Sequence, residues 1–219
     1  MVINKIGQQH IDFGTNCQDY GFEKNHYKIV CDGCSEGLNS EVGAKTFCHL
    51  FRHQDLYEGS FVASASKWIF DRYLFNLFGQ TDESIKNYLC FTIMGVYEAP
   101  DAFAVSYCGD GYIILQKTDG EIVLEEINDG EFPKYYAYNY ANKEHLKYYK
   151  EGVEFTRTVF YKDTFTNVGI ASDGLRFIDK DPEHRGEFIK LLKQGKEAPL
   201  KRFINKHQSI FKDDITIVF

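Results

Sequence analysis

Long β-prone runs in the middle of the chain constrain its fold more than any other feature. The stretches YLCFTIMGVYE (88–98), AFAVSYCGDGYIILQ (102–116) and EIVLEEI (121–127) are rich in β-branched, aromatic and other apolar residues. The sequences APD and TDG separate them, and both are typical of turns. Apolar runs of strand length joined by short turns predict a meander of antiparallel strands.

The remaining segments add helices and further strands around this meander. Two β-prone runs between residues 20 and 32 predict a hairpin. Apolar residues recur at helical spacing from Glu41 to His53 and from Ser60 to Phe78. Strand patterns follow in TRTVFYK and TNVGIASDG, helical patterns in HRGEFIKLLKQG and PLKRFINKHQ, and a last strand in ITIVF. This order predicts an α+β layered fold, and the lack of a linker indicates a single domain over 1–219.

The segment from Phe132 to Tyr149 is rich in tyrosine and lysine and has no clear periodicity. Such a stretch predicts a long irregular excursion of the chain. It is either a flap that borders the functional cleft and contacts substrate or a plain structural insertion. The sequence leaves both interpretations open.

Composition and charge disfavour several classes of protein. Hydrophobic residues make up 43% and aromatic residues 16% of the chain, which is typical of a globular protein. The 25 Lys and Arg against 32 Asp and Glu give a net charge of -7, which disfavours nucleic acid as a partner. No run reaches the roughly 18 apolar residues of a membrane helix, and the start MVINKIGQQH lacks the apolar stretch of a signal peptide. We therefore expect a soluble cytoplasmic protein without a membrane partner.

Two cysteines, Cys31 and Cys34, flank the pair Asp32-Gly33 directly after an apolar run. Their spacing suits a redox dithiol or half of a zinc site. Zinc needs four ligands, and the sequence contains no second pair at such spacing. The carboxylate between the thiols also disfavours thiolates by like-charge repulsion. We therefore favour a carboxylate site here, with the thiol site as the alternative.

Acidic residues recur at the ends of the expected strands. They are Asp19, Asp32, Asp110, Asp173 and Asp213. Carboxylates at strand ends can converge at one edge of a sheet, and Mg²⁺ and Mn²⁺ prefer such oxygen ligands. One isolated Asp-Gly pair is more typical of a hairpin turn. The ordered combination of all five is what indicates a metal site.

The series NCQD (16–19), VCDGCSEGLNSEVGA (30–44), CGDGYIIL (108–115), IASDGL (170–175) and DDITIVF (213–219) resembles the motifs of a known family. These are the type 2C metal-dependent serine/threonine protein phosphatases, in particular their compact bacterial branch. The resemblance implies a four-layer α-β-β-α sandwich in which helices flank two central, mostly antiparallel sheets. It also implies hydrolysis of phosphoserine or phosphothreonine in a protein substrate, paired with a serine/threonine kinase.

The same resemblance implies roles for individual residues. Asp32 would bridge two Mg²⁺ or Mn²⁺ ions, the Gly33 carbonyl would bind one of them, and Asp173 and Asp213 would complete the other. Asp19 would hold a metal-bound water, which makes Asp19, Asp32 and Asp173 the expected catalytic carboxylates. Asp110 matches the position of a third, weaker ion.

Several positions depart from the family pattern. Gln18 stands where larger members have Glu, and no arginine lies between Ile11 and Cys17 to hold the phosphate. His10 either takes that phosphate-binding role or is a surface histidine. Cys34 replaces a histidine that is a candidate proton donor in many members. These departures leave a catalytically silent binding module as the alternative, although retention of the metal carboxylates favours an active phosphatase.

Overall fold

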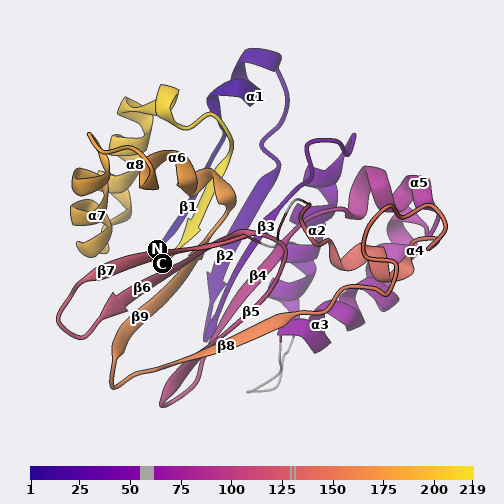
Figure 1. The fold of residues 1–219 in the computed structure, drawn as a ribbon, viewed down its shortest axis with the longest axis horizontal. Coiled ribbons are helices and arrows are strands. Elements are labelled where there is room, and N and C mark those ends of the chain that lie inside the picture. The colour runs from indigo at the N-terminus through magenta and orange to yellow at the C-terminus, as the bar shows by residue number, and fades with distance from the viewer. Residues whose placement is uncertain (55–61, 129, 131) are drawn as a thin grey trace.

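The computed structural model describes residues 1–54, 62–128, 130 and 132–219 (Figure 1). In this part of the chain, ten strands form two five-stranded antiparallel sheets. The first sheet has the order β1-β10-β9-β6-β7 and the second the order β2-β3-β4-β5-β8. The strands are β1 (Val2–Lys5), β2 (Asp19–Lys24), β3 (Tyr27–Asp32), β4 (Ile93–Glu98), β5 (Ala102–Cys108), β6 (Gly111–Lys117), β7 (Ile122–Ile127), β8 (Thr156–Tyr161), β9 (Phe165–Ala171) and β10 (Ile215–Val218).

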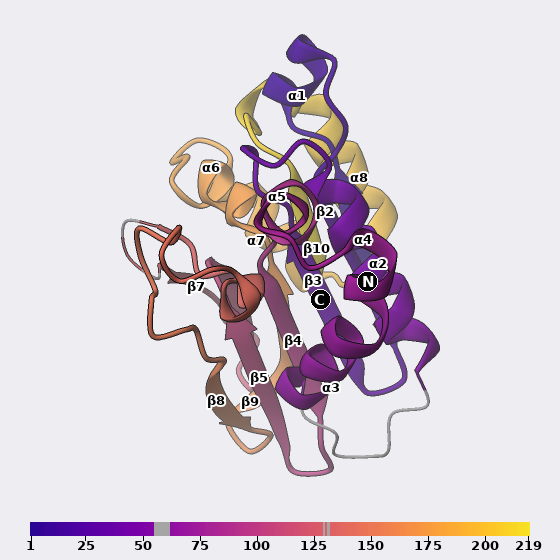
Figure 2. The same cartoon turned by 90° about the vertical axis from the view of Figure 1, so that its right-hand side faces the viewer.

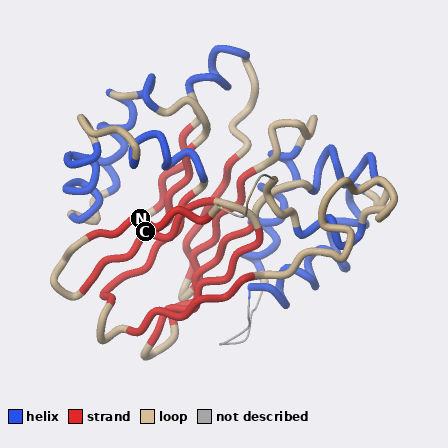
Figure 3. The backbone as a smooth tube through the Cα atoms, viewed as in Figure 1, coloured by secondary structure: helices blue, strands red, loops and turns tan. Residues whose placement is uncertain are grey.

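Helices cover both sides of the paired sheets (Figure 3). Their bounds are α1 (Gln8–Phe13), α2 (Ser40–His53), α3 (Val62–Ile69), α4 (Phe75–Phe78), α5 (Asp82–Ser84), α6 (Arg176–Asp179), α7 (Arg185–Lys193) and α8 (Glu197–Lys206). Short 3₁₀ or π segments are η1 (Phe70–Leu74), η2 (Ile85–Leu89), η3 (Tyr136–Tyr140), η4 (Asp173–Leu175) and η5 (Gln208–Ile210). No helix in the described ranges has the length and apolar character that crossing a membrane requires.

Strand alternation explains why the central strands are apolar on both faces. In β3, Ile29 and Cys31 pack into the core under α2, whereas Val30 lies in the core between the sheets. In β6, Tyr112 packs into the core under α7 and α8, and Ile113 lies between the sheets. Successive side chains of a strand point to opposite faces, so a sheet covered on both sides needs apolar residues at every position. The expected α+β sandwich with helices on both sides is confirmed.

The predicted meander is wrong at one connection, the one between β5 and β6. Strands β4 and β5 pair with each other, as do β6 and β7, but β5 and β6 belong to different sheets. The chain changes sheet at Gly109-Asp110-Gly111, where Gly109 and Gly111 have φ values of 113° and 145°. These values favour glycine because other residues rarely adopt them. A period of two predicts strands, but it does not show which strand will be the neighbour.

Most other predicted elements occur with small changes of boundary. The hairpin consists of β2 and β3, and Asn25 in its turn has a φ of 53°. The second predicted helix becomes α3, η1 and α4 in succession, while its expected first residues, Ser60 and Phe61, lie outside the described residues. The run 88–98 begins with the end of η2 and enters a strand only at β4. Strand β1, which pairs with β10, has no counterpart in the prediction.

The segment 132–149 is irregular apart from η3, as predicted, and it lies over the α3–α5 side of the molecule (Figure 2). Its aromatic rings attach it there: the ring centroids of Phe70 and Tyr136 are 5.2 Å apart, and those of Phe75 and Tyr140 are 4.6 Å apart. The hydroxyl of Tyr140 donates a hydrogen bond of 2.8 Å to Asp71. The excursion is therefore packed onto the helical layer.

Helix α2 approaches η2 so closely that one of its positions requires glycine. A Cβ atom at Gly43 would lie 1.6 Å from the carbonyl oxygen of Tyr88, whereas one at Gly186 in α7 would meet nothing within 4 Å. Gly43→Ala should lower the free energy of unfolding by about 1–3 kcal/mol, because the backbone must shift. Gly186→Ala is the matched control and should raise it by up to about 1 kcal/mol, because alanine favours helix. Urea unfolding of both variants measures the difference, and equal effects would contradict this packing.

Candidate active site

The five predicted carboxylates lie at strand ends or in the crossover between the sheets. Asp19 begins β2 and Asp32 ends β3, where the two are register partners. Asp173 begins η4, two residues after the last residue of β9, and Asp213 precedes β10. Asp110 lies in the crossover from β5 to β6. Both sheets therefore contribute to the cluster.

Asp32 lies between Asp19 and Asp173 and contacts both. The Asp32 carboxyl shares hydrogen bonds with the carboxyls of both Asp19 and Asp173. Asp19 is 1% exposed, and its Oδ2 accepts a hydrogen bond from the hydroxyl of Ser172. Ser172 lies between β9 and η4, and its Oγ also accepts a 2.9 Å hydrogen bond from the backbone N–H of Thr216 in β10. Ser172 thus connects Asp19 of the second sheet to the first sheet.

The crowding of these carboxyls raises their pKa values. Burial raises the pKa of Asp19 and of Asp32, and the neighbouring negative charges raise the pKa of Asp32 further. Burial also raises the pKa of Asp173, to about 6, although the adjacent Arg176 opposes that change. Removing carboxylates from water and placing them together disfavours their charged forms. Positive charge at this point would therefore be strongly favoured.

The donor set fits a hard divalent cation. Oδ1 of Asp19 is buried without a hydrogen-bond partner, and such an oxygen is available as an ion or water ligand. As arranged, however, no group of three or more His, Cys, Asp or Glu among the described residues could hold an ion. These carboxyls are engaged by one another instead, because Asp32 shares hydrogen bonds with Asp19 and Asp173. Asp173 also forms an ion pair with Arg176. The residue types fit Mg²⁺ or Mn²⁺, and ligation requires these contacts to rearrange.

Asp214, the second acid of the pair before β10, is a buried member of the site for which the sequence pattern predicts no role. It is 2% exposed and accepts hydrogen bonds of 2.7 Å from the backbone N–H of Gly7 and 2.5 Å from that of Gln18. Nδ1 of His10 lies 2.9 Å from its Oδ2, and Nε2 of His10 lies 4.0 Å from Oδ1 of Asp213. The His10 side chain is only 13% exposed, which does not fit a surface histidine. Asp214 therefore attaches the N-terminal segment to the start of β10.

Arg176 was also missed, although it follows the motif IASDGL directly. Its Nη1 lies 2.8 Å from Oδ2 of Asp173, and its Nη2 lies 3.8 Å from Oδ2 of Asp213. Arg176, Asp110 and Asp173 line one cavity of about 220 Å³. The structure thus brings Asp110 to the same side of the cluster as Asp173.

The cysteines do not form a paired site. None of the six, all of which lie in the described part of the chain, forms a disulfide bond. Cys31 is fully buried, and burial raises its pKa well above the ordinary value, while its contact with Cys48 raises it further. The backbone N–H of Cys34 donates to the carbonyl of Cys90. A thiolate at Cys31 is disfavoured, and the thiol alternative loses its main support.

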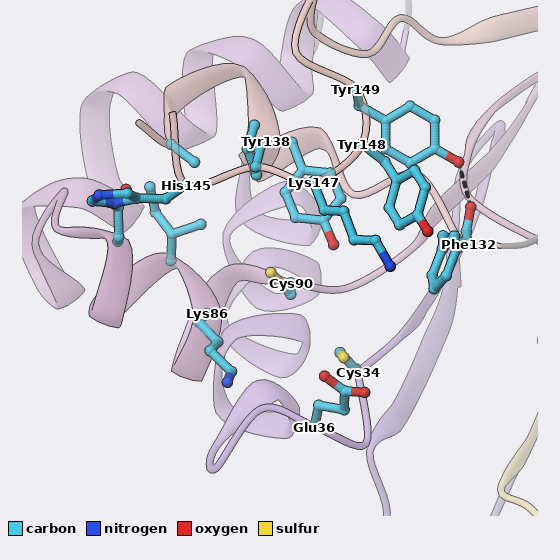
Figure 4. A pocket seen from close by; sticks show the side chains of 14 residues that line it. Cys34, Glu36, Lys86, Cys90, Phe132, Tyr138, His145, Lys147, Tyr148 and Tyr149 are labelled. Atoms are coloured by element: carbon cyan, nitrogen blue, oxygen red, sulfur yellow. Dashed lines mark hydrogen bonds and ion pairs between the residues drawn. The ribbon is translucent and has the colours of Figure 1, made fainter. Parts of the chain in front are cut away.

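A pocket of about 310 Å³ begins at Cys34, one residue beyond Gly33, and extends under the segment 132–149 (Figure 4). Lys86 of η2 and Lys147 of the segment both line it. The amine of Lys147 lies 5.0 Å from the ring centroid of Tyr148. The Tyr-rich segment therefore lies beside the carboxylate cluster, with the pocket next to Gly33.

The raised pKa values make stability depend on pH in a defined direction. Between about pH 4 and 6 the folded protein keeps a proton on Asp173 that the unfolded chain loses, so this stabilisation disappears as the pH rises through about 6. In EDTA, the Tm should therefore be lower at about pH 8 than at about pH 5, by about 4 °C or more. Mn²⁺ should reverse the loss at the higher pH, because it binds deprotonated carboxylates.

Thermal unfolding of the parent and of Asp173→Asn in EDTA measures this effect. The variant has no carboxyl to titrate at that position, so its Tm should change less between the two pH values. Identical pH dependence of the two proteins would contradict the pKa assignment.

Comparison with known proteins agrees with the geometry. The family model of protein phosphatase 2C matches residues 6–207, whereas no curated protein matches the chain. A bacterial serine phosphatase has 15% sequence identity and a TM-score of 0.63, over 99% of this chain and 94% of that chain. Stp1 from Staphylococcus aureus has 14% identity and a TM-score of 0.60, over 99% and 92%. The catalytic domain of PstP in complex with two manganese ions has 14% identity and a TM-score of 0.61, over 99% and 94%.

These structures share the fold, and the family model covers most of the sequence, as the motif resemblance indicated. The chain belongs to the protein phosphatase 2C family.

Proposed function

We propose that the chain, as one domain over 1–219, is a metal-dependent phosphatase that hydrolyses phosphoserine and phosphothreonine in proteins. The observation that carries the proposal is the contact of Asp19, Asp32 and Asp173, which come from both sheets and include the unpartnered buried oxygen of Asp19. Such an arrangement is costly for a protein unless protons or cations compensate the negative charge, and cations do so at a pH where the carboxyls lose their protons. Family membership supports the same activity.

Each residue has a definite task in this proposal. Asp32, the Gly33 carbonyl, Asp173 and Asp213 would hold two Mn²⁺ or Mg²⁺ ions, and Asp110 a third, weaker one. Two such cations, when bound, supply hydroxide near neutral pH and offset the charge of the phosphoryl oxygens. Asp19, fixed by Ser172, would accept a hydrogen bond from the attacking water and orient it. His10, held beside Asp214, would contact the phosphate.

The departures from the family pattern have structural consequences. The amide of Gln18 lies 3.4 Å from Oγ of Ser40 and 3.5 Å from the carbonyl of Cys34, so it fixes the loop after Gly33. It adds no charge to the metal ligands. This observation favours the second candidate, a silent module that binds a phosphoprotein without hydrolysing it. The intact set of carboxylates favours the active enzyme.

The proposed substrate is a protein that a serine/threonine kinase has phosphorylated. The segment 132–149 and its pocket would contact residues near the phosphorylated one. Six cysteines that form no disulfide bond among the described residues suit a reducing compartment, so we place the activity in the cytoplasm.

Turnover of p-nitrophenyl phosphate and of a phosphothreonine peptide tests the proposal. With Mn²⁺ or Mg²⁺ both should be hydrolysed, and EDTA should abolish the reaction. Asp32→Asn and Asp173→Asn should each lower kcat at least about 100-fold, because each removes a negative ligand. Asp163→Asn, in an exposed turn, is the matched control and should keep full activity.

The outcomes separate the two candidates. Turnover in EDTA, or full activity of both Asp32→Asn and Asp173→Asn, would refute the two-metal site. Binding of Mn²⁺ and of the phosphopeptide without turnover would identify the silent module.

The thiol alternative has its own variant. The double substitution Cys31→Ser with Cys34→Ser should leave turnover and its dependence on Mn²⁺ in place, because neither thiol is a proposed ligand. Loss of activity together with loss of bound zinc would show that the cysteines form the site.

A further inference from the structure

Arg176 is held in a fixed position at the edge of the carboxylate cluster. It is the first residue of α6, immediately after η4. Its Nη1 pairs with Asp173 at 2.8 Å, and its Nη2 lies 3.8 Å from Asp213 on the other side. The guanidinium also lies over the ring of Phe177, 5.1 Å from the centroid. Contacts on several sides reduce the freedom of a long side chain, so its charge is positioned in advance.

The guanidinium keeps donors for a further partner. It carries five N–H groups in one plane, and the two ion pairs do not use all of them. The side chain is 40% exposed and forms part of the wall of the 220 Å³ cavity that Asp110 and Asp173 also line. A fork of N–H donors that reaches a polar cavity matches the geometry of phosphate oxygens.

The charge of the site favours such a group. Carboxylates surround the cavity, and a phosphate monoester dianion would be repelled by any negative charge left uncompensated. Among the described residues, His10 and Arg176 are the basic side chains paired with Asp173, Asp213 or Asp214. Only the arginine is charged at every working pH. The sequence between Ile11 and Cys17 supplies no arginine.

We propose that Arg176 binds the phosphoryl group of the substrate, anchored by Asp173 and Asp213. This proposal rests on the proposed function and adds a phosphate-binding residue to it. The guanidinium faces Oδ2 of each carboxylate, so Asp173 and Asp213 could bind a cation through Oδ1 once Asp173 no longer shares a hydrogen bond with Asp32. Arg176 and the metal ligands can therefore act together.

The competing interpretation gives Arg176 a structural task only. In that case it neutralises Asp173 and stabilises the start of α6 without touching substrate. The two interpretations differ in phosphate affinity, since a purely structural ion pair should not change the binding of phosphate to metal-loaded protein.

Calorimetric titration of the Mn²⁺-loaded protein with inorganic phosphate tests the proposal, alongside KM and kcat for p-nitrophenyl phosphate. Arg176→Ala should weaken phosphate binding about 10- to 100-fold and raise KM by a similar factor, because a charge-assisted pair is lost. Arg176→Lys should recover part of the affinity, since it keeps the charge without the fork. Added guanidinium ion should partly restore phosphate binding to Arg176→Ala.

Arg185→Ala is the matched control. Arg185 is similarly exposed and pairs with Asp179 at 2.8 Å, in the same region of the chain but outside the carboxylate cluster. Its substitution should change neither phosphate affinity nor KM. A Mn²⁺ titration of each variant, without phosphate, should give dissociation constants within about threefold of the parent value, since Asp173 remains a ligand.

Unchanged phosphate affinity in Arg176→Ala, within about twofold, would overturn the proposal. So would a loss of Mn²⁺ affinity large enough to account for the loss of phosphate binding, because Arg176 would then act on the ligands. Absence of turnover in the parent protein would count against the proposed function, while the phosphate titration would still decide the role of Arg176.

Discussion

The structure depends on the close approach of carboxylates from two sheets. Asp19 and Asp32 are neighbours across β2 and β3, and Asp173 reaches them from the end of β9. Ser172 stabilises the contact, because its hydroxyl donates to Asp19 while its Oγ accepts from Thr216. Like charges repel, so a protein places them together only where protons or cations compensate. The packing of the two sheets thus gathers carboxyl groups at one end of the sandwich, where protons or cations must compensate their negative charge.

The backbone around Asp213-Asp214 shows how tightly this end is packed. A Cβ atom at Gly7 would lie 2.2 Å from the carbonyl carbon of Asp213, and one at Gly174 would lie 1.8 Å from the carbonyl oxygen of Asp214. Glycine therefore allows the N-terminal segment and η4 to meet the chain just before β10. Three distant segments of sequence meet there. The two consecutive acids have different contacts, since Asp214 accepts backbone N–H groups and Asp213 lies near the guanidinium of Arg176.

Local pattern explains which parts of this architecture could be predicted. The hairpin that ends at Asp32 and the helix α2 follow from periods of two and 3.6, which depend only on neighbouring residues. The change of sheet at Gly109-Asp110 could not be predicted, because pairing between strands is decided by the whole core. The carboxylates were found because their order along the chain resembles a family. Asp214 and Arg176 were missed because their roles depend on contacts with segments distant in sequence or on the geometry of the folded site.

Charge balance connects the departures from the family pattern. With Gln18 in place of an acid, the centre has one negative charge fewer among its neighbours, and less positive charge is needed to compensate it. Arg176 adds a permanent positive charge beside Asp173 and Asp213. Gln18 and Arg176 have the same effect on charge: each makes the site less repulsive to an anion than a cluster of carboxylates alone. In a chain whose net charge is -7, an anionic substrate is attracted only by local charge of this kind. Gln18 and Arg176 therefore both lower the repulsion that an anion meets at this site, and the charge of Arg176 does so independently of metal occupancy.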